Sequence, residues 1–380
     1  MKIGSIEPVA PVVLAPMAGV TNAPFRTMCR SFAPGLVYVN EMVMATAVVH
    51  GNAKTERMMT FAPDEQPRSL QLYGSDPVMV GAAVRRLCDE GRIDHLDMNF
   101  GCPAAKVTRR GGGAAVPAKP NLLRAIVREA VRAASPYGVP VTIKFRKGLF
   151  ESLLTHVQTG RIAAEEGVAA IALHARTAEQ HYAGTADWDA IAELKAAVPD
   201  IPVLGNGDIW EAADAVAMMR HTNCDGVVVG RGCLGRPWLF RDLVDALAGG
   251  PVQSAPLLGE VCNVMAAHAR LLAGHLGENL ALSQAAQATR FAEVWKENAW
   301  NSFRLRVTGD APKITLWIND VQMWEVQEPK NDKIAGEVDG FIGLQLHWTA
   351  PTSAAGSSMG PTTWKPGGVL RFRNLFLKEL

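Results

Sequence analysis

Residues 95–107, HLDMNFGCPAAKV, carry a largely apolar run directly into Gly101, Cys102 and Pro103. The run has the length and composition of a buried strand, and the glycine and proline after it are typical strand terminators. The sequence therefore predicts a strand whose carboxyl end bears a single cysteine. Free cysteines are among the most buried side chains, so Cys102 by itself is more typical of a packed interior than of a reactive site.

The same kind of unit repeats up to about residue 245. Seven of the eight strand-like runs are followed by helix-like material, such as DPVMVGAAVRRLCDEG at residues 76–91. Apolar strands that alternate with helices are typical of a parallel sheet covered by helices. Eight units predict an α/β protein with a closed (β/α)8 TIM barrel, whereas a doubly wound open sheet, the alternative, usually has fewer strands. The other seven runs are PVVLAPM (11–17), GLVYVNEM (35–42), RSLQLYG (68–74), VTIKFR (141–146), AIALHAR (170–176), PVLGNGD (202–208) and DGVVVGRG (225–232).

The pattern changes twice after the barrel. Residues 255–288 are rich in Ala and Leu at helical spacing, and the chain from about residue 301 alternates apolar and polar side chains. Turn signals at 309–310 and 319–320 separate the alternating runs, which favours antiparallel strands. We therefore expect a barrel at residues 1–250, a short helical segment at 251–288 and an all-β unit at 289–380.

The composition is that of a soluble globular chain with a large core: 380 residues, 48% hydrophobic and 20% charged, with a net charge of +1. A net charge near zero argues against a general nucleic-acid coat but is compatible with a local basic face. The N-terminal residues lack the features of a signal peptide or a membrane span, so we expect a cytoplasmic protein without membrane contact. No CxxC pair occurs, which predicts reduced thiols and no metal site; the cysteines are Cys29, Cys88, Cys102, Cys224, Cys233 and Cys262.

Polar residues stand at or near the carboxyl ends of six consecutive predicted strands. In a (β/α)8 barrel these ends meet at one face, where the active sites of such enzymes lie. Any single one fits a satisfied polar group of the core, but their convergence predicts a pocket. They are Gln71, Asn99, Cys102, Lys144, His174, Arg176, Asn206, Gly207, Asp208, Gly230 and Arg231.

The loops after the last two predicted strands indicate the type of ligand. GNGD and GRG expose backbone N–H groups that can hold a phosphate, and Arg231 adds a positive charge. GRGCLG at 230–235 also matches the GxGxxG dinucleotide pattern, but no second strand with an acidic end follows it. A phosphate-bearing flavin fits better, with Lys144 beside its reduced ring and Gln71 and Asn206 as amide partners. The alternative for Lys144 is an ion pair with a neighbouring carboxylate.

Seven motifs in order resemble the bacterial tRNA-dihydrouridine synthases of the B-type branch. They are APMAGVTNAPFR (15–26), EMV (41–43), QLYGSDP (71–77), DMNFGCPAAKVTRRGGGAAV (97–116), LHARTAEQHYAG (173–184), GNGDI (205–209) and GRGCLGRPWLF (230–240). The resemblance extends from Met1 to about residue 283. It implies an FMN-binding catalytic barrel that uses NADPH as reductant, followed by a helical domain that binds tRNA.

The resemblance also implies roles for individual residues. Cys102 is expected to protonate C5 of the target uracil once C6 has received a hydride, which requires a thiol that keeps its proton near neutral pH. Asn99 and Arg176 are expected to bind the substrate, and the basic run KVTRR (106–110) to contact tRNA phosphates. The residues expected to hold FMN are Pro16, Met17, Ala18, Gln71, Lys144, His174, Asn206, Gly207, Asp208, Gly230 and Arg231.

The last third of the chain departs from this family, because its helical segment is truncated. WNSFRLRVTGDAPKITLWINDV (300–321), GFIGLQLHW (340–348) and LRFRNLFLKEL (370–380) resemble the second half of 3-keto-disaccharide-hydrolase-like domains, which have a concanavalin-type sandwich. About 90 residues cannot supply both sheets of such a sandwich, so this resemblance implies a partial β-sandwich with exposed strand edges.

The sequence leaves three functions open. The motifs favour a tRNA-dihydrouridine synthase that works as a monomer on tRNA. A second possibility is another FMN barrel oxidoreductase of the dihydroorotate dehydrogenase kind, which also uses a cysteine beside a pyrimidine, although the contexts GCPAAKV and LHARTAEQHYAG argue against it. The third is an inactive fusion product whose β tail binds carbohydrate or a protein partner.

Overall fold

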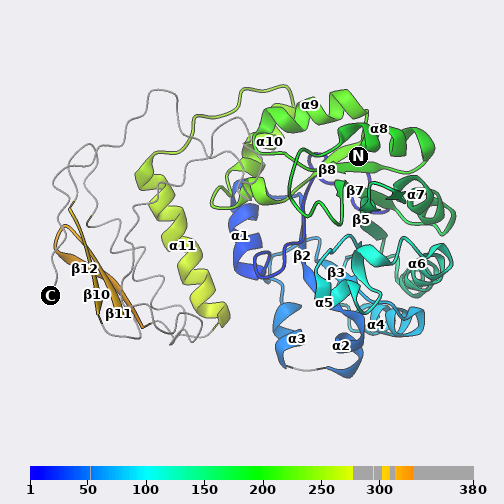
Figure 1. Cartoon of the computed structure of the whole chain (residues 1–380), viewed down its shortest axis with the longest axis horizontal. Helices are drawn as coiled ribbons and strands as arrows, with labels where there is room; N and C mark the ends of the chain where they lie inside the picture. Colours follow the sequence, from blue (N-terminus) through cyan, green and yellow to red (C-terminus); the bar gives the residue numbers. More distant parts are fainter. Residues whose placement is uncertain (52, 277–293, 295–301, 309–312, 328–380) are drawn as a thin grey trace.

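The computed structural model describes residues 1–51, 53–276, 294, 302–308 and 313–327. Its larger part is a closed barrel of eight parallel strands surrounded by helices (Figure 1). The barrel strands are β1 (Val12–Leu14), β2 (Val37–Met44), β3 (Ser69–Tyr73), β4 (His95–Phe100), β5 (Val141–Phe150), β7 (Ala170–Thr177), β8 (Val203–Asn206) and β9 (Gly226–Val229).

The barrel closes because its first strand pairs with its last. Strand β1 is hydrogen-bonded to β2 on one side and to β9 on the other, and β4 pairs with β5 to complete the ring. All eight residues of β7 and all four of β9 are buried, as expected for strands packed on both faces. The predicted TIM barrel and all eight predicted strands are therefore confirmed.

Helices cover the outside of the barrel, and each packs on its neighbours in chain order from α6 to α10. Their starts follow capping rules: Asp76 accepts from Val78 N and Met79 N at the start of α4, directly before a proline. These helices are α1 (Ala23–Phe32), α2 (Ala45–His50), α3 (Ala53–Met58), α4 (Pro77–Asp89), α5 (Ala105–Thr108), α6 (Pro120–Ala134), α7 (His156–Glu165), α8 (Trp188–Ala197), α9 (Ala212–Thr222) and α10 (Leu239–Leu247).

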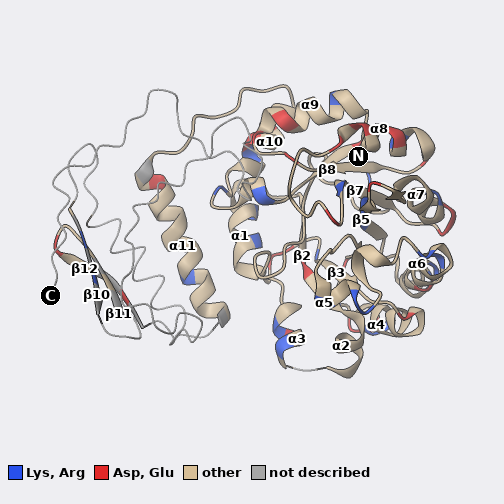
Figure 2. Cartoon of the chain, viewed as in Figure 1, with Lys and Arg blue, Asp and Glu red and all other residues tan. Residues whose placement is uncertain are grey.

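Charges of both signs are interspersed over the outer helices (Figure 2). Arg124 and Arg128 of α6, for example, both pair with Glu166 at the end of α7, with shortest N–O distances of 2.8 Å. Positive and negative side chains therefore balance one another on the outer helices, in keeping with the net charge of +1. None of the helices in the described residues is long and apolar enough to cross a lipid bilayer.

Strand β5 is longer than the sequence suggested. It continues past Arg146 to Phe150 and forms an antiparallel hairpin with β6 (Leu153–Leu154). The buried Lys147 amine holds this extension, because it pairs with Glu151 within the hairpin at 2.9 Å and with Asp187 at 3.2 Å. Asp187 is 40 residues from Lys147 and could not be foreseen from local sequence.

Two further elements follow the barrel. Helix α11 (Leu258–Leu276) packs against α1, where the rings of Phe25 and His268 meet edge to face with centroids 5.9 Å apart. Strands β10 (Phe303–Thr308), β11 (Lys313–Ile318) and β12 (Val321–Gln327) form the predicted antiparallel sheet. The predicted turn at Asn319 and Asp320 is confirmed by their positive φ angles of 48° and 64°. The predicted turn at 309–310, the helix beyond 276 and the strands at 340–348 and 367–380 lie outside the described residues.

Candidate active site

The carboxyl ends of the barrel strands bring two of the predicted site residues into direct contact. Lys144 of β5 donates from Nζ to Oδ1 of Asn206 on β8 at 2.8 Å, and Asn206 Nδ2 donates to the carbonyl of Val228 on β9 at 2.7 Å. Strand β7 lies between β5 and β8 in the barrel, so the first bond reaches past it through the interior. The two side chains mark the floor of the candidate site.

The Lys144 amine is buried beside a neutral partner. The pKa of Lys144 is lowered to about 7, chiefly by burial and secondarily by the charge of Arg146, while Asp97 acts in the opposite direction. Among the described residues Lys144 forms no ion pair with a carboxylate, the alternative that the sequence left open. A buried amine that gains or loses its proton near neutral pH is typical of a functional site and is suited to an anionic ligand.

His174 lies among positively charged side chains. Burial is the largest cause that holds the pKa of His174 well below its usual range, and the surrounding cations depress it further, so the imidazole is neutral. The Arg231 guanidinium stacks 4.4 Å from the centroid of the Tyr182 ring, and that of Arg146 lies 5.6 Å from the same centroid. The strand ends therefore concentrate positive charge around one aromatic ring and one neutral histidine.

Arg176 lies inside this cluster. Its Nη2 donates to both Asp208 carboxylate oxygens at 2.7 and 2.8 Å and to the Gly184 carbonyl at 2.6 Å, and Nε donates to Ala183 O at 3.1 Å. The side chain is 2% exposed. Nη1 is buried and has no hydrogen-bond partner among the described residues. A buried donor without a partner is costly, and a bound ligand would relieve that cost.

Gly207 allows the loop after β8 to pass close to this arginine. It has a φ of +131°, and a Cβ there would lie 2.6 Å from the Cβ of Ala186 and 3.7 Å from Arg176 Nη1. Its carbonyl accepts from Trp188 Nε1 at 3.1 Å, which fixes the loop against the start of α8. Only glycine fits this backbone, and its absent side chain leaves space beside the unpartnered nitrogen.

The loop after β1, which holds Pro16, Met17 and Ala18, lies beside the loop after β9. Ala15 N donates to Val229 O at 2.8 Å, and a Cβ at Gly230 would lie 3.9 Å from Met17 Sδ. Thr21 keeps the loop folded, because its Oγ1 accepts from Met17 N at 3.0 Å. The predicted residues of the first and last strands are thus neighbours.

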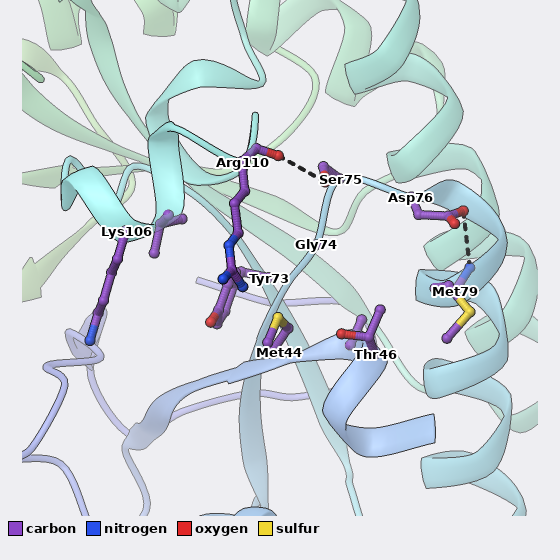
Figure 3. A pocket seen from close by; sticks show the side chains of 12 residues that line it. Met44, Thr46, Tyr73, Gly74, Ser75, Asp76, Met79, Lys106 and Arg110 are labelled. Atoms are coloured by element: carbon purple, nitrogen blue, oxygen red, sulfur yellow. Dashed lines mark hydrogen bonds between the residues drawn. The ribbon is translucent and has the colours of Figure 1, made fainter. Parts of the chain in front are cut away.

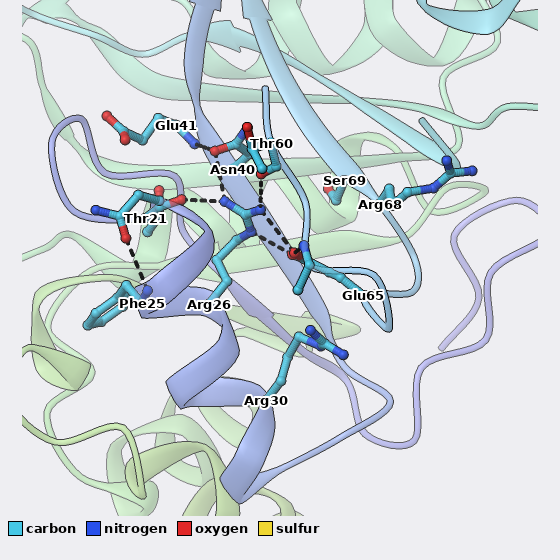
Figure 4. A network of polar contacts seen from close by, with 12 residues as sticks. Thr21, Phe25, Arg26, Arg30, Asn40, Glu41, Thr60, Glu65, Arg68 and Ser69 are labelled. Carbon is cyan, nitrogen blue, oxygen red and sulfur yellow. Dashed lines mark hydrogen bonds and ion pairs between the residues drawn. The ribbon is translucent and has the colours of Figure 1, made fainter. Parts of the chain in front are cut away.

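A buried arginine that the sequence did not single out anchors this loop (Figure 4). Arg26 of α1 donates to Thr21 O at 2.7 Å, to Asn40 Oδ1 at 2.8 Å and to Thr60 O at 2.9 Å. It also binds both oxygens of the buried Glu65, at 2.5 and 3.0 Å. All five guanidinium donors are therefore used, and the first candidate cofactor loop rests on this pair.

Gln71, Asn99 and the Cys102 loop form a connected series. Asn99 Nδ2 donates to Gln71 Oε1 at 2.7 Å, while Asn99 Oδ1 accepts from the backbone N–H groups of Gly101 and Cys102 at 3.1 and 2.9 Å. All six cysteines lie in the described residues, and five of them are buried, whereas Cys102 is half-buried. Cys102 is thus the cysteine that solvent and ligands can reach.

Gly113 packs against the back of the Cys102 loop. It has a φ of +56°, and a Cβ there would lie 2.6 Å from the carbonyl oxygen of Cys102 and 3.2 Å from its Cβ. The same carbonyl accepts from Ala114 N at 3.0 Å. The GGG run at 111–113 therefore permits a close backbone contact that limits where the thiol can lie.

A cavity of about 110 Å³ opens beside this loop (Figure 3). Lys106 and Arg110 line it from the α5 side, and neither forms an ion pair with any carboxylate in the described part of the chain. Tyr73 lines it from the end of β3; burial raises the pKa of its hydroxyl, as does the nearby Cys102, whereas Arg110 opposes this. The one lining carboxylate, Asp76, is bound to the start of α4. The cavity is therefore basic, and one of its lining residues, Tyr73, lies close enough to Cys102 for the two groups to interact electrostatically.

The residues at the strand ends suit a phosphorylated flavin. They supply amide groups from Gln71 and Asn206, the Lys144 amine, and the unpartnered Nη1 of Arg176 beside the space left by Gly207. Within the described residues no group of three or more His, Cys, Asp or Glu side chains is placed to hold a metal ion. A site rich in donors and positive charge accommodates an anionic organic cofactor.

Two family models match the chain. The model described as dihydrouridine synthase matches residues 13–311, and one described as a 3-keto-alpha-glucoside-1,2-lyase-like domain matches residues 253–378. The two resemblances expected from the sequence are thereby confirmed.

Individual proteins agree with the first model. A probable tRNA-dihydrouridine synthase of Mycobacterium tuberculosis is 56% identical over 285 residues, which cover 73% of this chain and 73% of that protein. The tRNA-dihydrouridine synthase B of Xanthomonas campestris is 38% identical over 278 residues, covering 73% and 82%. A solved structure described as "Crystal structure of TcOYE with pHBA" aligns with 67% of this chain and 93% of its own chain, at a TM-score of 0.46 and 9% sequence identity. The match to the dihydrouridine synthase model and the two tRNA-dihydrouridine synthase relatives together establish that this chain belongs to the dihydrouridine synthase family.

Proposed function

We propose that the protein reduces the C5–C6 double bond of particular uridines in tRNA, with bound FMN and with NADPH as the reductant. The observation that carries this proposal is the position of Cys102. It is the accessible cysteine of the chain, it follows β4, and it stands beside a pocket in which buried cations outnumber carboxylates. The names of the relatives, which refer to tRNA-dihydrouridine synthases, support the same substrate.

Residues in or directly after six of the barrel strands would hold the cofactor. Lys144 and Asn206 would lie beside the flavin ring, and Gly230 and Arg231 would bind its phosphate. Arg176 would contribute its Nη1, the one donor that Asp208 and the loop carbonyls leave open. The FMN, when bound, supplies the hydride that adds to C6 of uracil. The other residues of this proposed set are Pro16, Met17, Ala18, Gln71, His174, Gly207 and Asp208.

Cys102 would give its thiol proton to C5 of uracil. General acids must lie within hydrogen-bond reach of the atom they protonate, and the bonds from the loop to Asn99 restrict where the thiol can point. His174 is neutral and buried, so it can act as a hydrogen-bond partner without adding charge. Solvent then restores the proton on the half-buried thiol.

The basic cavity would hold the strand next to the reacting uridine. The uridine must leave its stack to reach the barrel, which costs a few kcal/mol. Lys106 and Arg110 have no carboxylate partner among the described residues and can bind the neighbouring phosphate, while Tyr73 offers an aromatic face for a base. Arg176 is too buried to contact tRNA in this way.

The division of the chain is also a proposal. We assign residues 1–250 to the catalytic barrel, 251–288 to a shortened tRNA-binding segment and 289–380 to a partial β-sandwich. The packing of α11 on α1 supports a helical segment that stays attached to the barrel. We further propose that the protein acts as a monomer in the cytoplasm.

The first experiment measures reduction of tRNA. Purified protein is examined for a flavin spectrum and then incubated with NADPH and tRNA that lacks dihydrouridine. We expect a yellow protein, NADPH oxidation that depends on tRNA, and nucleosides heavier by two hydrogen atoms. Cys102→Ala should lower the rate by about 100-fold or more, since general acids typically contribute 10²–10⁴-fold.

The same assay separates the alternatives. A protein without flavin that does not oxidise NADPH would favour the inactive fusion product. Oxidation or reduction of the flavin by dihydroorotate or orotate, with no effect of tRNA, would favour the dihydroorotate dehydrogenase kind of enzyme. Either result would contradict the proposed function.

A further inference from the structure

A continuous series of polar side chains crosses the barrel interior and ends at the Cys102 loop. Strand register places its members side by side: Ser69 opposite His95, Gln71 opposite Asp97, and Asp97 opposite Thr142. Asp97 is where two arms of the series meet. Gln71 Nε2 donates to its Oδ2 at 2.6 Å, and Thr142 Oγ1 donates to its Oδ1 at 2.6 Å.

The arm that leads to Cys102 has only one possible direction. The backbone N–H groups of Gly101 and Cys102 can only donate, so Asn99 must present its oxygen to them. The amide nitrogen of Asn99 then faces Gln71 Oε1, and the nitrogen of Gln71 faces Asp97. Each amide orientation fixes the next. The arm therefore requires an acceptor at position 97.

The other arm can run in either direction. Thr142 donates to Asp97, so its oxygen accepts from His95 Nε2 at 2.9 Å, and His95 Nδ1 accepts from Ser69 Oγ at 2.6 Å. Burial lowers the pKa of His95 to about 4, which leaves a neutral ring with one donor and one acceptor nitrogen. Hydroxyls and a neutral imidazole can exchange donor and acceptor roles. This arm can therefore reverse without breaking.

We propose that Asp97 is a positioning residue that holds Cys102 in place through Gln71 and Asn99, by serving as the fixed acceptor at the origin of the series. It contacts neither the thiol nor the pocket cations directly. Burial raises the pKa of Asp97 to about 6, while the bonds from Thr142 and Gln71 and the charge of Lys144 act against that rise. The inference rests on the proposed function for the reaction that it serves, whereas the hydrogen bonds themselves do not depend on it.

Three variants separate an acceptor from a general structural role. Asp97→Ala removes the acceptor. Asp97→Asn keeps one oxygen for Gln71, and its amide nitrogen can donate to Thr142 because the His95 arm reverses. Ser69→Ala is the matched control: it deletes an equally buried hydroxyl from the far end of the reversible arm.

The main readout is the position of the thiol, independent of catalysis. Native protein is treated with iodoacetamide, and the modified cysteines are identified by mass spectrometry. The five buried cysteines report global opening, whereas Cys102 reports its own loop. The second readout compares flavin reduction by NADPH with transfer to tRNA, because only the transfer requires the Cys102 thiol.

We expect Asp97→Ala to change the alkylation rate of Cys102 alone, with an increase of about 3- to 10-fold as the loop is released. Transfer to tRNA should slow by about 10- to 100-fold, as expected for a catalytic group displaced by about 1 Å. Flavin reduction should change far less. Ser69→Ala should resemble the wild type in all of these measurements. Asp97→Asn should resemble the wild type in Cys102 alkylation, whereas loss of the Asp97 charge that acts on Lys144 can change its flavin reduction.

The proposal is overturned if Asp97→Ala leaves Cys102 alkylation unchanged, if Ser69→Ala has an equal effect, or if Asp97→Asn behaves like Asp97→Ala. If Asp97→Ala does not fold, Gln71→Leu breaks the same arm one step nearer the thiol and must raise Cys102 alkylation. A wild-type protein that does not reduce tRNA would contradict the proposed function alone, because the alkylation comparison still decides the role of Asp97.

Discussion

Two buried arginines lie at opposite sides of the candidate cofactor site and differ in one respect. Arg26 uses all five of its donors within the protein, on Glu65 and on three oxygens of neighbouring segments. Arg176 is equally buried and is also paired with a carboxylate, yet its Nη1 has no partner among the described residues. Every donor of Arg26 is hydrogen-bonded within the protein, whereas Arg176 keeps one donor nitrogen without a partner.

This difference separates an arginine that stabilises the fold from one that can bind a ligand. A saturated arginine stabilises the fold and has nothing left to offer a ligand, whereas an unsatisfied buried donor carries a cost that a ligand can remove. Arg26 sits behind the loop after β1, and Arg176 sits beside the open space at Gly207. Positive charge alone does not identify a binding residue; unsatisfied bonding capacity does.

The largest expected effect follows from removal of the saturated arginine. Arg26→Leu leaves Glu65 buried and unpaired, which should lower the free energy of unfolding by about 3–5 kcal/mol. The matched control is Arg30→Leu in the same helix (Figure 4). The partner of Arg30, Asp64, is 79% exposed. That change should cost less than about 1 kcal/mol. Urea denaturation of both variants measures the difference, and equal losses would contradict the scaffold role of Arg26.

The next largest effect concerns the candidate cofactor site, where the affinity for FMN should depend on pH through Lys144. Without a bound anion the pKa of Lys144 is lowered to about 7, so the amine loses its charge as the pH rises through 7. The flavin ring proposed to lie beside Lys144 is anionic only in its reduced form, and that charge favours the protonated amine. The affinity for reduced FMN should therefore fall with rising pH, by about tenfold between pH 6.5 and 8.5. This window lies above the pKa of Asp97, which is about 6.

Anaerobic titration of reduced FMN into the cofactor-free protein, followed by quenching of the tryptophan fluorescence, checks this dependence. Lys144→Met is the control and should bind FMN more weakly, with an affinity that barely changes over the same window. An affinity of the wild type that does not vary with pH would show that Lys144 does not face the anionic cofactor.

The smallest expected effect is a difference in stability between alanine substitutions at two glycines of the run at 111–113, which have similar backbone angles. Gly111 and Gly113 both have positive φ angles, of 74° and 56°, but a Cβ at Gly111 meets nothing within 4 Å, whereas one at Gly113 meets Cys102 O. Gly111→Ala should cost about 1 kcal/mol for the backbone alone. Gly113→Ala should cost about 1 kcal/mol more and should also change the alkylation rate of Cys102. Equal behaviour of the two variants would mean that the close contact at Gly113 does not hold the loop.

The sequence predicted the barrel because the signals for its strands are local. Each of the eight runs is apolar, short and bounded by turn residues, and parallel strands buried on both faces have this composition. The convergence of Lys144 and Asn206 was expected from the barrel geometry, although Lys144 lies within β5 and only Asn206 stands at a strand end. The antiparallel sheet after residue 301 was predicted in the same way, from alternation.

What the sequence could not predict depends on partners far apart in the chain. Arg26 and Glu65 are separated by 39 residues with no periodicity to link them. Arg176 was expected to bind the substrate, and its pairing with Asp208, 32 residues away, which buries the side chain, could not be read from the sequence. The Asp97 series depends on strand register, which no single run determines. The spacing of residues in the sequence predicted where the strands end, but it did not predict the hydrogen bonds and ion pairs between side chains of different strands.

The most direct test of the central claim is where solvent hydrogen enters the product. Wild-type protein reduces tRNA with NADPH in deuterated water, and the dihydrouridine is analysed by mass spectrometry and NMR. If the exchangeable Cys102 thiol protonates C5, deuterium should enter at C5, and Cys102→Ala should slow product formation by about 100-fold or more. Undiminished turnover by Cys102→Ala, or ordinary hydrogen at C5, would contradict the account.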